Sequence, residues 1–196
     1  MENSHVKNEI RVLGIDDMPF DKFKDKETKV VGVMYRGGSF LDGVLSTVVK
    51  VDGDDATQKI SEMVNRSRFK KQIRCILLDG IAVAGFNVID IVRLSTMTGL
   101  GVIVIMRSMP ETERIHKALR KLGMDKKIPL LQNAGKIHAV SDVNRGQICM
   151  QCHGISARKA KEIIRTTSTH SFIPEPIRVA HMIGQGVKLG ESKGNA

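Results

Sequence analysis

The sequence has no tryptophan, one tyrosine, six phenylalanines and three cysteines among its 196 residues. So few cysteines exclude a disulfide-stabilised scaffold, and the polar stretch Met1–Arg11 lacks the apolar core of a secretory signal peptide. Apolar runs such as Val102–Met106 are far shorter than the ~20 residues of a membrane span. We therefore expect a cytoplasmic protein with no membrane partner. The shortage of aromatic residues also disfavours a surface that binds single strands by base stacking.

Positive charge is in excess, with 31 Lys and Arg residues against 21 Asp and Glu residues, a net charge of +10 and a pI near 9.7. Such an excess attracts polyanions, of which nucleic acid is the first candidate. The alternative is a lysine-rich surface that is only solvated. The length and ordinary composition predict one globular domain over residues 1–196, with 1–9 and 190–196 flexible.

The predicted elements begin with three strands, after which strands and helices alternate. The strands are expected over 10–15, 29–36, 40–51, 73–78, 101–106 and 147–152. The helices are expected after Asp54 or Asp55, over 87–98 with Asn87 as N-cap, after a capping box at 108–111, from Ser156 and from Pro174. A three-strand antiparallel meander followed by βα units predicts an α/β protein with a mixed sheet and helices on both faces, which is the ribonuclease H-like fold. A receiver-type doubly wound domain would need a helix directly after Asp17, where the sequence offers none.

Two aspartates, Asp16 and Asp79, each end a buried strand of this predicted sheet. If the first and fourth strands are parallel neighbours, ~4.8 Å apart, the two carboxylates lie side by side. They repel unless one is protonated or a cation lies between them, which predicts a Mg²⁺ or Mn²⁺ site. Asp55, or Asp54 in its place, could add a third carboxylate, although Asp at a helix N-terminus is also expected for capping alone. The alternative for Asp16 and Asp79 is that they only mark strand-to-turn boundaries.

The last predicted helix carries a polar stripe. At ~100° per residue, Arg178, His181, Gln185 and Lys188 fall on one side of it. If this side faces the acidic residues, His181 could orient water or protonate a leaving oxygen. Otherwise the stripe is the exposed face of an amphipathic helix.

The segment Cys149–His153 matches the pattern of c-type haem attachment. That chemistry belongs to exported proteins, and one Cys-x-x-Cys pair supplies only part of a zinc site. We therefore expect no haem there.

Five motifs together resemble the endonuclease dU family of archaeal proteins. They are LGIDD (13–17), VDGDDAT (51–57), LDG (78–80), AGFNVID (84–90) and IPEPIRVAH (173–181), and the resemblance runs from about Ile10 to Ser192. The family is related to endonuclease V, which has a ribonuclease H-like fold and nicks DNA or RNA near deaminated bases with Mg²⁺ or Mn²⁺. The resemblance therefore implies a nuclease of this fold.

The resemblance also implies roles for individual residues. Asp16 and Asp79 match the two catalytic aspartates, Asp55 lies where endonuclease V has a glutamate, and His181 matches the active-site histidine. Arg107 falls about where that enzyme has a phosphate-contacting lysine. The residues expected to contact nucleic acid are Arg178, Lys188, Arg107, Gly80 and Asn87.

Two features of endonuclease V are missing. Residues 42–51 replace its strand-separating Pro-Tyr-Ile-Pro wedge, and Gly85-Phe86-Asn87 replaces a His-Pro-Arg sequence. This implies a different base pocket, with deoxyuridine favoured over inosine. The resulting hypothesis is a metal-dependent endodeoxyribonuclease that nicks DNA near a deaminated base in DNA repair. The alternatives are a non-catalytic nucleic-acid-binding protein of the same fold and a phosphatase-like enzyme, which the charge disfavours.

Overall fold

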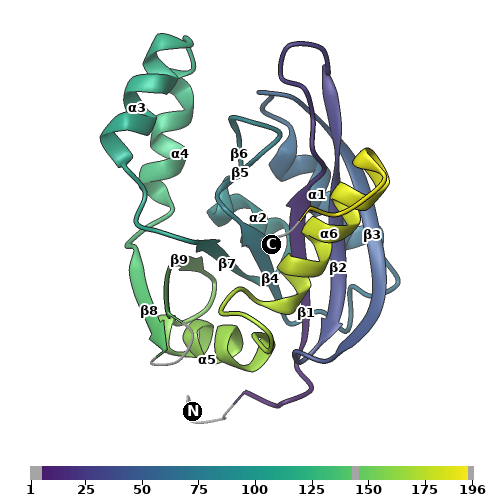
Figure 1. Cartoon of the computed structure of the whole chain (residues 1–196). Helices are drawn as coiled ribbons and strands as arrows, with labels where there is room; N and C mark the ends of the chain where they lie inside the picture. The colour runs from purple at the N-terminus through teal and green to yellow at the C-terminus, as the bar shows by residue number, and fades with distance from the viewer. Residues whose placement is uncertain (1–5, 143–145, 194–196) are drawn as a thin grey trace.

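The structure is a computed structural model that describes residues 6–142 and 146–193. Within them a mixed sheet has the strand order β3-β2-β1-β4-β7-β9-β8 (Figure 1). Its strands are β1 (Arg11–Asp17), β2 (Glu27–Arg36), β3 (Phe40–Lys50), β4 (Cys75–Asp79), β7 (Gly101–Met106), β8 (His138–Asp142) and β9 (Gly146–His153). The β1–β2–β3 meander is antiparallel, whereas β1, β4 and β7 run parallel, as predicted. Of the chain ends predicted to be flexible, 1–5 and 194–196 lie outside the described residues.

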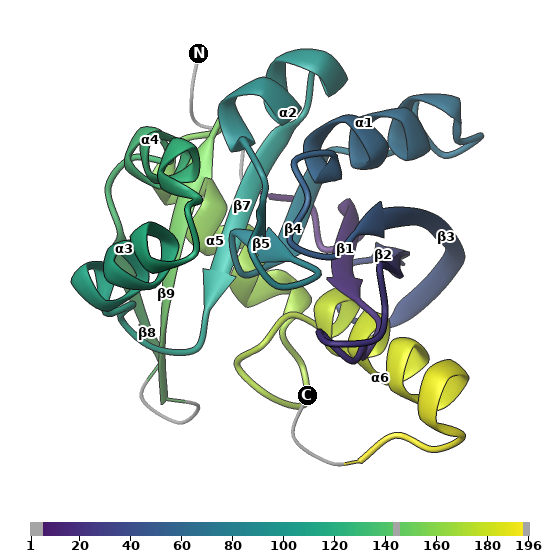
Figure 2. The ribbon, with the colours of Figure 1, turned by 90° about the horizontal axis from the view of Figure 1, so that it is seen from above.

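Helices cover both faces of this sheet, as the sequence predicted (Figure 2). They are α1 (Ala56–Arg66), α2 (Ile91–Thr98), α3 (Thr112–Lys121), α4 (Ile128–Asn133), α5 (Ala157–Thr167) and α6 (Glu175–Leu189), with a 3₁₀ turn η1 (Asp125–Lys127). One buried apolar cluster joins α1 and α2 to the sheet, and another joins α5 and the start of α6 to its opposite face. None of the helices in the described ranges is long and apolar enough to cross a membrane.

The start of α2 and the capping of α1 differ from the prediction, and both differences involve Asn87. This residue lies in a short ribbon of β5 (Ala82–Val83) and β6 (Asn87–Val88), and α2 begins only after Asp90, whose side chain accepts the Arg93 N–H at 2.9 Å. At α1, Asp55 is the N-cap residue but makes no capping bond. The Asn87 Oδ1 accepts the Ala56 N–H at 3.0 Å instead. Asn87, which is 31 positions away from Ala56 in the chain, therefore caps α1 in place of Asp55.

The N-terminus of α3 and the last strands of the sheet also differ. Glu111 is the N-cap residue of α3 and makes no side-chain capping bond, so the predicted capping box is absent. The predicted short strand over 147–152 is the middle of β9, and its partner β8 was not predicted.

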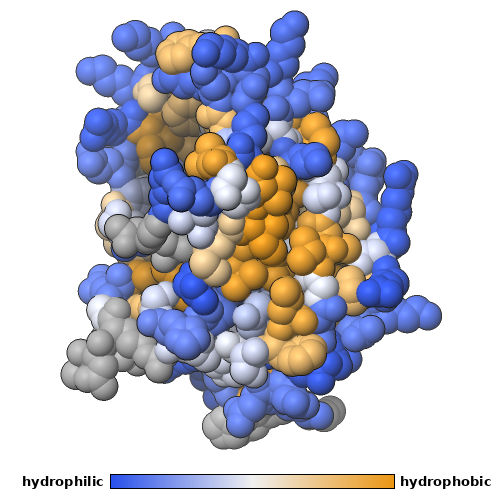
Figure 3. All heavy atoms as spheres, turned by 45° about the vertical axis from the view of Figure 1, so that its right-hand side comes forward, coloured by the Kyte–Doolittle hydropathy of each residue, from blue (hydrophilic) through white to orange (hydrophobic). Residues whose placement is uncertain are grey.

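Apolar side chains are exposed on the side of the molecule formed by α6 and β3 (Figure 3). They include Val44 and Val48 of β3 and Val187 and Leu189 of α6. Such a surface does not match a phosphate backbone. The predicted functional residues Asp16 and Asp79 lie elsewhere, at the carboxyl ends of β1 and β4.

Candidate metal centre and active site

Asp16 and Asp79 are neighbours, as predicted. The register between β1 and β4 places Ile15 opposite Leu78, so the next residue of each strand is one of the two aspartates. Asp16 is only 5% exposed. One ligand atom from each of Asp16, Asp79 and His181 lies within 4.8 Å of the others, a group that could hold a metal ion.

Close packing of α6 on β1 brings His181 to this group. A Cβ on Gly14 would lie 2.4 Å from the backbone carbon of Pro176, so only glycine allows this approach. One turn into the helix, His181 Nδ1 lies 2.8 Å from Asp16 Oδ2. His181 therefore faces the acidic residues, as predicted.

Gln185 fixes how the His181 ring is hydrogen-bonded. The Lys193 N–H donates to Gln185 Oε1 at 2.7 Å, which leaves the amide nitrogen of Gln185 facing His181 Nε2 at 2.9 Å. This amide can only donate, so His181 Nε2 accepts and Nδ1 carries the proton given to Asp16. Because both ring nitrogens have partners, the carboxylates are the groups of this cluster that are left to bind a metal ion. The sequence placed Gln185 on the polar stripe but gave it no role.

We expect Gln185→Leu to weaken Mn²⁺ binding by up to about 10-fold, the low end of the range for losing a group bonded to a metal ligand, because Gln185 acts on Asp16 only through His181. Without the amide donor, the His181 ring no longer has a fixed tautomer and holds Asp16 less firmly. Calorimetric titration with Mn²⁺ measures the affinity, and nitrogen NMR shifts of the imidazole report the tautomer. The exposed Gln132→Leu is the control. An unchanged affinity and tautomer in Gln185→Leu would contradict the assignment.

The electrostatics of the site favour a bound cation. Burial, with the charges of Asp79 and Asp17, raises the pKa of Asp16 to about 8. Burial also raises the pKa of Asp17, although the Ala84 N–H bound to its carboxylate at 2.6 Å opposes this. A hard divalent cation with oxygen ligands relieves the repulsion and suits this donor set. Asp17 is a member of the site that sequence reasoning missed, since the alternation of a strand suggests that neighbours face opposite ways.

A cleft of about 530 Å³ opens beside these groups. Its polar lining is Asp16, Asp17, Asp79, Gly80, Arg107 and His181, and its apolar lining is Met18, Pro19, Phe20, Ile105 and Met106. Arg107 Nη1 lies 3.1 and 3.3 Å from the two Asp79 carboxylate oxygens. The predicted residues Arg107 and Gly80 are thus placed at the cleft beside the acidic pair.

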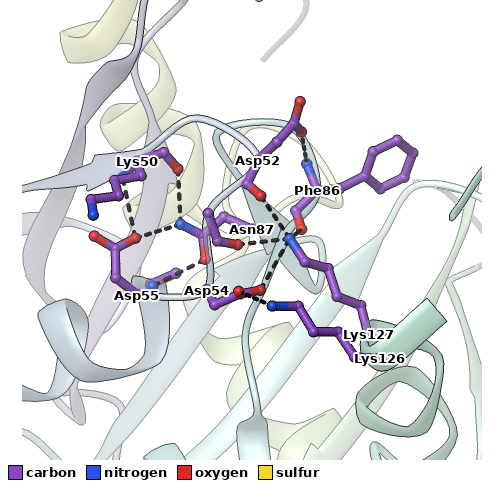
Figure 4. A network of polar contacts seen from close by, with 10 residues as sticks. Lys50, Asp52, Asp54, Asp55, Phe86, Asn87, Lys126 and Lys127 are labelled. Atoms are coloured by element: carbon purple, nitrogen blue, oxygen red, sulfur yellow. Dashed lines mark hydrogen bonds and ion pairs between the residues drawn. The ribbon is translucent and has the colours of Figure 1, made fainter. Parts of the chain in front are cut away.

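Asp55 and Asp54 are held in a separate network (Figure 4). Asp55 Oδ1 accepts from the Asn87 amide at 2.7 Å and from the Lys50 N–H at 3.1 Å. Asp54 forms an ion pair with Lys126 at 2.5 Å. The structure therefore does not bring either candidate for the third carboxylate into the group of Asp16, Asp79 and His181.

Asn87 is fully buried, which contradicts its predicted contact with nucleic acid. Its amide donates to the Lys50 carbonyl at 2.9 Å as well as to Asp55, and its oxygen binds the Ala56 N–H. All three of these hydrogen bonds serve the loop before α1 and the first residue of that helix. Asn87 is therefore structural.

Arg178 and Lys188 do not line the cleft either. Arg178 donates to the buried Glu175 at 2.6 and 2.8 Å. Burial raises the pKa of Glu175, but the bonds from Arg178 and the His170 N–H outweigh it and the pKa is lowered. Lys188 forms an ion pair with Asp25 at 3.1 Å. The predicted stripe on α6 is therefore divided among three different carboxylate partners.

Comparison with known proteins identifies the family of this chain. Residues 8–188 match the family model for endonuclease dU. The chain belongs to the endonuclease dU family. A UPF0215 protein of Methanothermobacter thermautotrophicus is 50% identical over 201 residues, which cover 100% of this chain and 98% of that protein. The resemblance found in the motifs is thereby confirmed.

Solved structures place the endonuclease dU chain in the endonuclease V fold. A protein of unknown function from Archaeoglobus fulgidus superposes with a TM-score of 0.81 at 36% identity, over 90% of this chain and 97% of that one. Endonuclease V of Ciona intestinalis, in complex with a 24mer DNA containing an inosine followed by a ribo-adenosine, superposes with a TM-score of 0.54 at 18% identity, over 87% and 82%. The family and the shared fold together support a nuclease. They confirm the predicted fold class.

Proposed function

We propose that this member of the endonuclease dU family is a Mg²⁺- or Mn²⁺-dependent endonuclease that cuts a DNA phosphodiester near a deaminated base, deoxyuridine before inosine, in cytoplasmic DNA repair. The observation that carries the proposal is the buried Asp16 carboxylate beside Asp79, bound by His181 at 2.8 Å, at the wall of an open cleft. The net charge of +10 supports a polyanionic substrate.

Asp16 and Asp79 are the residues that would hold the cation. When bound, the ion supplies a water of lowered pKa and stabilises charge on the leaving oxygen. His181 keeps the Asp16 carboxylate in place, and Arg107, half-exposed beside Asp79, is placed to contact a phosphate in the cleft. Gly80 has a φ of 81° and no side chain, which leaves room for a strand to approach the backbone. Asp55 stays the candidate for a third ligand, and joining the pair requires it to exchange its bond to Asn87 for the cation.

A cleavage assay tests the proposal. End-labelled oligonucleotides with uracil, inosine or no lesion, single- and double-stranded, are incubated with Mg²⁺, Mn²⁺ or EDTA. We expect nicking that depends on both lesion and metal and is lost in Asp79→Asn. Asp42→Asn, which removes a carboxylate held by Arg11 and Arg36 away from the cleft, should cut normally.

Three other outcomes would contradict the proposal in different ways. Salt-sensitive retention of the oligonucleotides without nicking would show the non-catalytic binding protein. Turnover of a generic phosphate ester without nucleic acid would favour a phosphatase-like enzyme. Faster nicking of inosine than of uracil would reverse the proposed base preference.

A further inference from the structure

The turn between β1 and β2 presents an aromatic ring to solvent. Phe23 is 88% exposed, in a chain with six phenylalanines, one tyrosine and no tryptophan. In Figure 1 this turn is the purple loop that rises beyond the carboxyl end of β1. A large apolar side chain gains nothing for folding in such a position. Its ring is therefore available to contact a partner.

Hydrogen bonds hold this turn in one shape. Asp21 Oδ1 accepts the Phe23 N–H at 2.9 Å, and Asp25 Oδ2 accepts the Asp21 N–H at 3.0 Å. Lys188 of α6 adds an ion pair to the same Asp25 oxygen at 3.1 Å. The turn is thus tied to the helix that carries His181. A ring presented by an ordered turn loses little conformational entropy on binding.

The turn continues the wall of the cleft. Met18, Pro19 and Phe20 line the cleft beside Asp16, and Phe23 follows three residues later. An extended chain spans at most ~3.6 Å per residue, so the Cα atoms of Phe20 and Phe23 are within about 11 Å of each other. Stacked bases rise ~3.4 Å per step along one strand. The Cα of Phe23 therefore lies within about three base steps of the cleft wall at Phe20.

Exposed cations flank Phe23, in a turn (residues 21–27) whose three lysines are balanced by two aspartates and one glutamate. The Lys22 ammonium lies 4.9 Å from the centre of the Phe23 ring, and Lys24 and Lys26 are also exposed. An aromatic ring between cations is the usual combination for unpaired strands, because the ring stacks on a base while the cations meet phosphates. An apolar protein partner would instead favour an apolar surround.

We propose that Phe23 stacks on an unpaired nucleobase of the strand held in the cleft. The inference rests on the proposed nuclease function and specifies its substrate: a strand that is single or locally opened beside the cut. In this proposal the β1–β2 turn contacts the opened strand, a task that the wedge of endonuclease V performs and that residues 42–51, which lack the wedge, cannot. A low count of aromatic residues does not exclude stacking when one ring stands at the cleft.

Fluorescence tests the contact directly, because Phe23→Trp creates the sole tryptophan of the chain. We expect its emission to be quenched on titration with a 20-nucleotide single-stranded uracil oligonucleotide in EDTA, which prevents the proposed metal-dependent cutting. The matched control is Phe40→Trp. Phe40 is 55% exposed and has the Arg36 guanidinium 5.1 Å from its ring. It lies opposite Arg36, which in turn lies opposite Arg11, at the end of β1 that is remote from Asp16. Its tryptophan should not be quenched.

Affinity tests the contribution of the ring. Phe23→Ala should weaken binding by about 5- to 150-fold, the range for loss of one stacked base, while Phe23→Trp binds like the wild type. Oligonucleotides that each carry one abasic site at a different position locate the stacked base. At that position the missing base should weaken binding by the wild type by the same factor, and it should not weaken binding by Phe23→Ala. If the wild type binds and cuts but Phe23→Ala binds equally well and Phe23→Trp is not quenched, this inference is wrong and the nuclease stands. If the wild type neither binds nor cuts, the proposed function fails as well.

Discussion

Replacement of Asp16 with Asn is expected to lower the cleavage rate by about 10³-fold or more, equivalent to ~4 kcal/mol, and to stabilise the metal-free protein. The loss follows because the variant removes a charged ligand from the site where the cation activates water. The gain follows because Asp16 is almost fully buried beside Asp79 and Asp17, so its charge opposes folding when no cation is bound. Cleavage rates and thermal melting in EDTA check both parts. A variant that is inactive but less stable would contradict the electrostatic account.

The same residue gives the stability of the metal-free protein a defined pH dependence. In the folded state burial raises the pKa of Asp16 from 3.8 to about 8. Between these values the folded protein holds a proton that the unfolded chain has released, so stability falls as pH rises from about 4 to about 8. Asp16→Asn should flatten this slope. Excess Mn²⁺ should raise the melting temperature of the wild type more at pH 8 than at pH 5, because its ligands must be deprotonated.

Asp42→Asn is the matched control for this experiment. Its carboxylate is held by Arg36 and Arg11, and the bonds from Arg36 are the main reason that its pKa is lowered. Removing that charge should therefore destabilise the protein slightly and leave the response to Mn²⁺ unchanged. An equal response of the two variants to Mn²⁺ would contradict a role for Asp16 in metal binding.

The sequence predicted that Asp16 and Asp79 lie side by side, because the features that place them are strong and local. Each follows an apolar run that can only be a buried strand, and the order of the strands made the two runs parallel neighbours. The helical period likewise placed His181 on the correct side of α6. These parts of the site depend on secondary structure and topology, which patterns of apolar residues determine.

The sequence did not predict the partners that hold Asn87, Arg178 and Lys188, most of which lie far away in the chain. Asn87 is buried because its side chain bonds to Lys50 and Ala56, which are 37 and 31 positions away in the chain. Arg178 and Lys188 share a helix face with His181, but Arg178 is held by a neighbour inside its own first turn and Lys188 by Asp25, 163 positions away. Spacing along a helix gives the direction of a side chain, and it does not give the carboxylate that it meets.

Replacement of Lys127 with Met is expected to lower the free energy of unfolding by about 3–5 kcal/mol, because three backbone carbonyls lose their donor at a cost of at least ~1 kcal/mol each. Lys127 is 2% exposed, and its ammonium donates to the carbonyls of Asp52, Gly53 and Phe86 at 2.8, 2.7 and 2.6 Å (Figure 4). Methionine fills a similar volume but leaves these carbonyls without a donor. For a chain of this size the melting temperature should fall by about 6–20 °C.

The control for this variant is its neighbour. Lys126→Met removes an exposed ammonium bound to Asp54, so it should cost less than about 1 kcal/mol. A large difference in unfolding free energy between the two variants would show that Lys127, which lies between α3 and α4, holds the loops at 52–53 and 86 together. The Asp52 N–H donates to the Ala84 carbonyl at 2.8 Å, and the Ala84 N–H binds Asp17 in the cleft. Loosening of this clamp should therefore also weaken Mn²⁺ binding, whereas Lys126→Met should leave it unchanged.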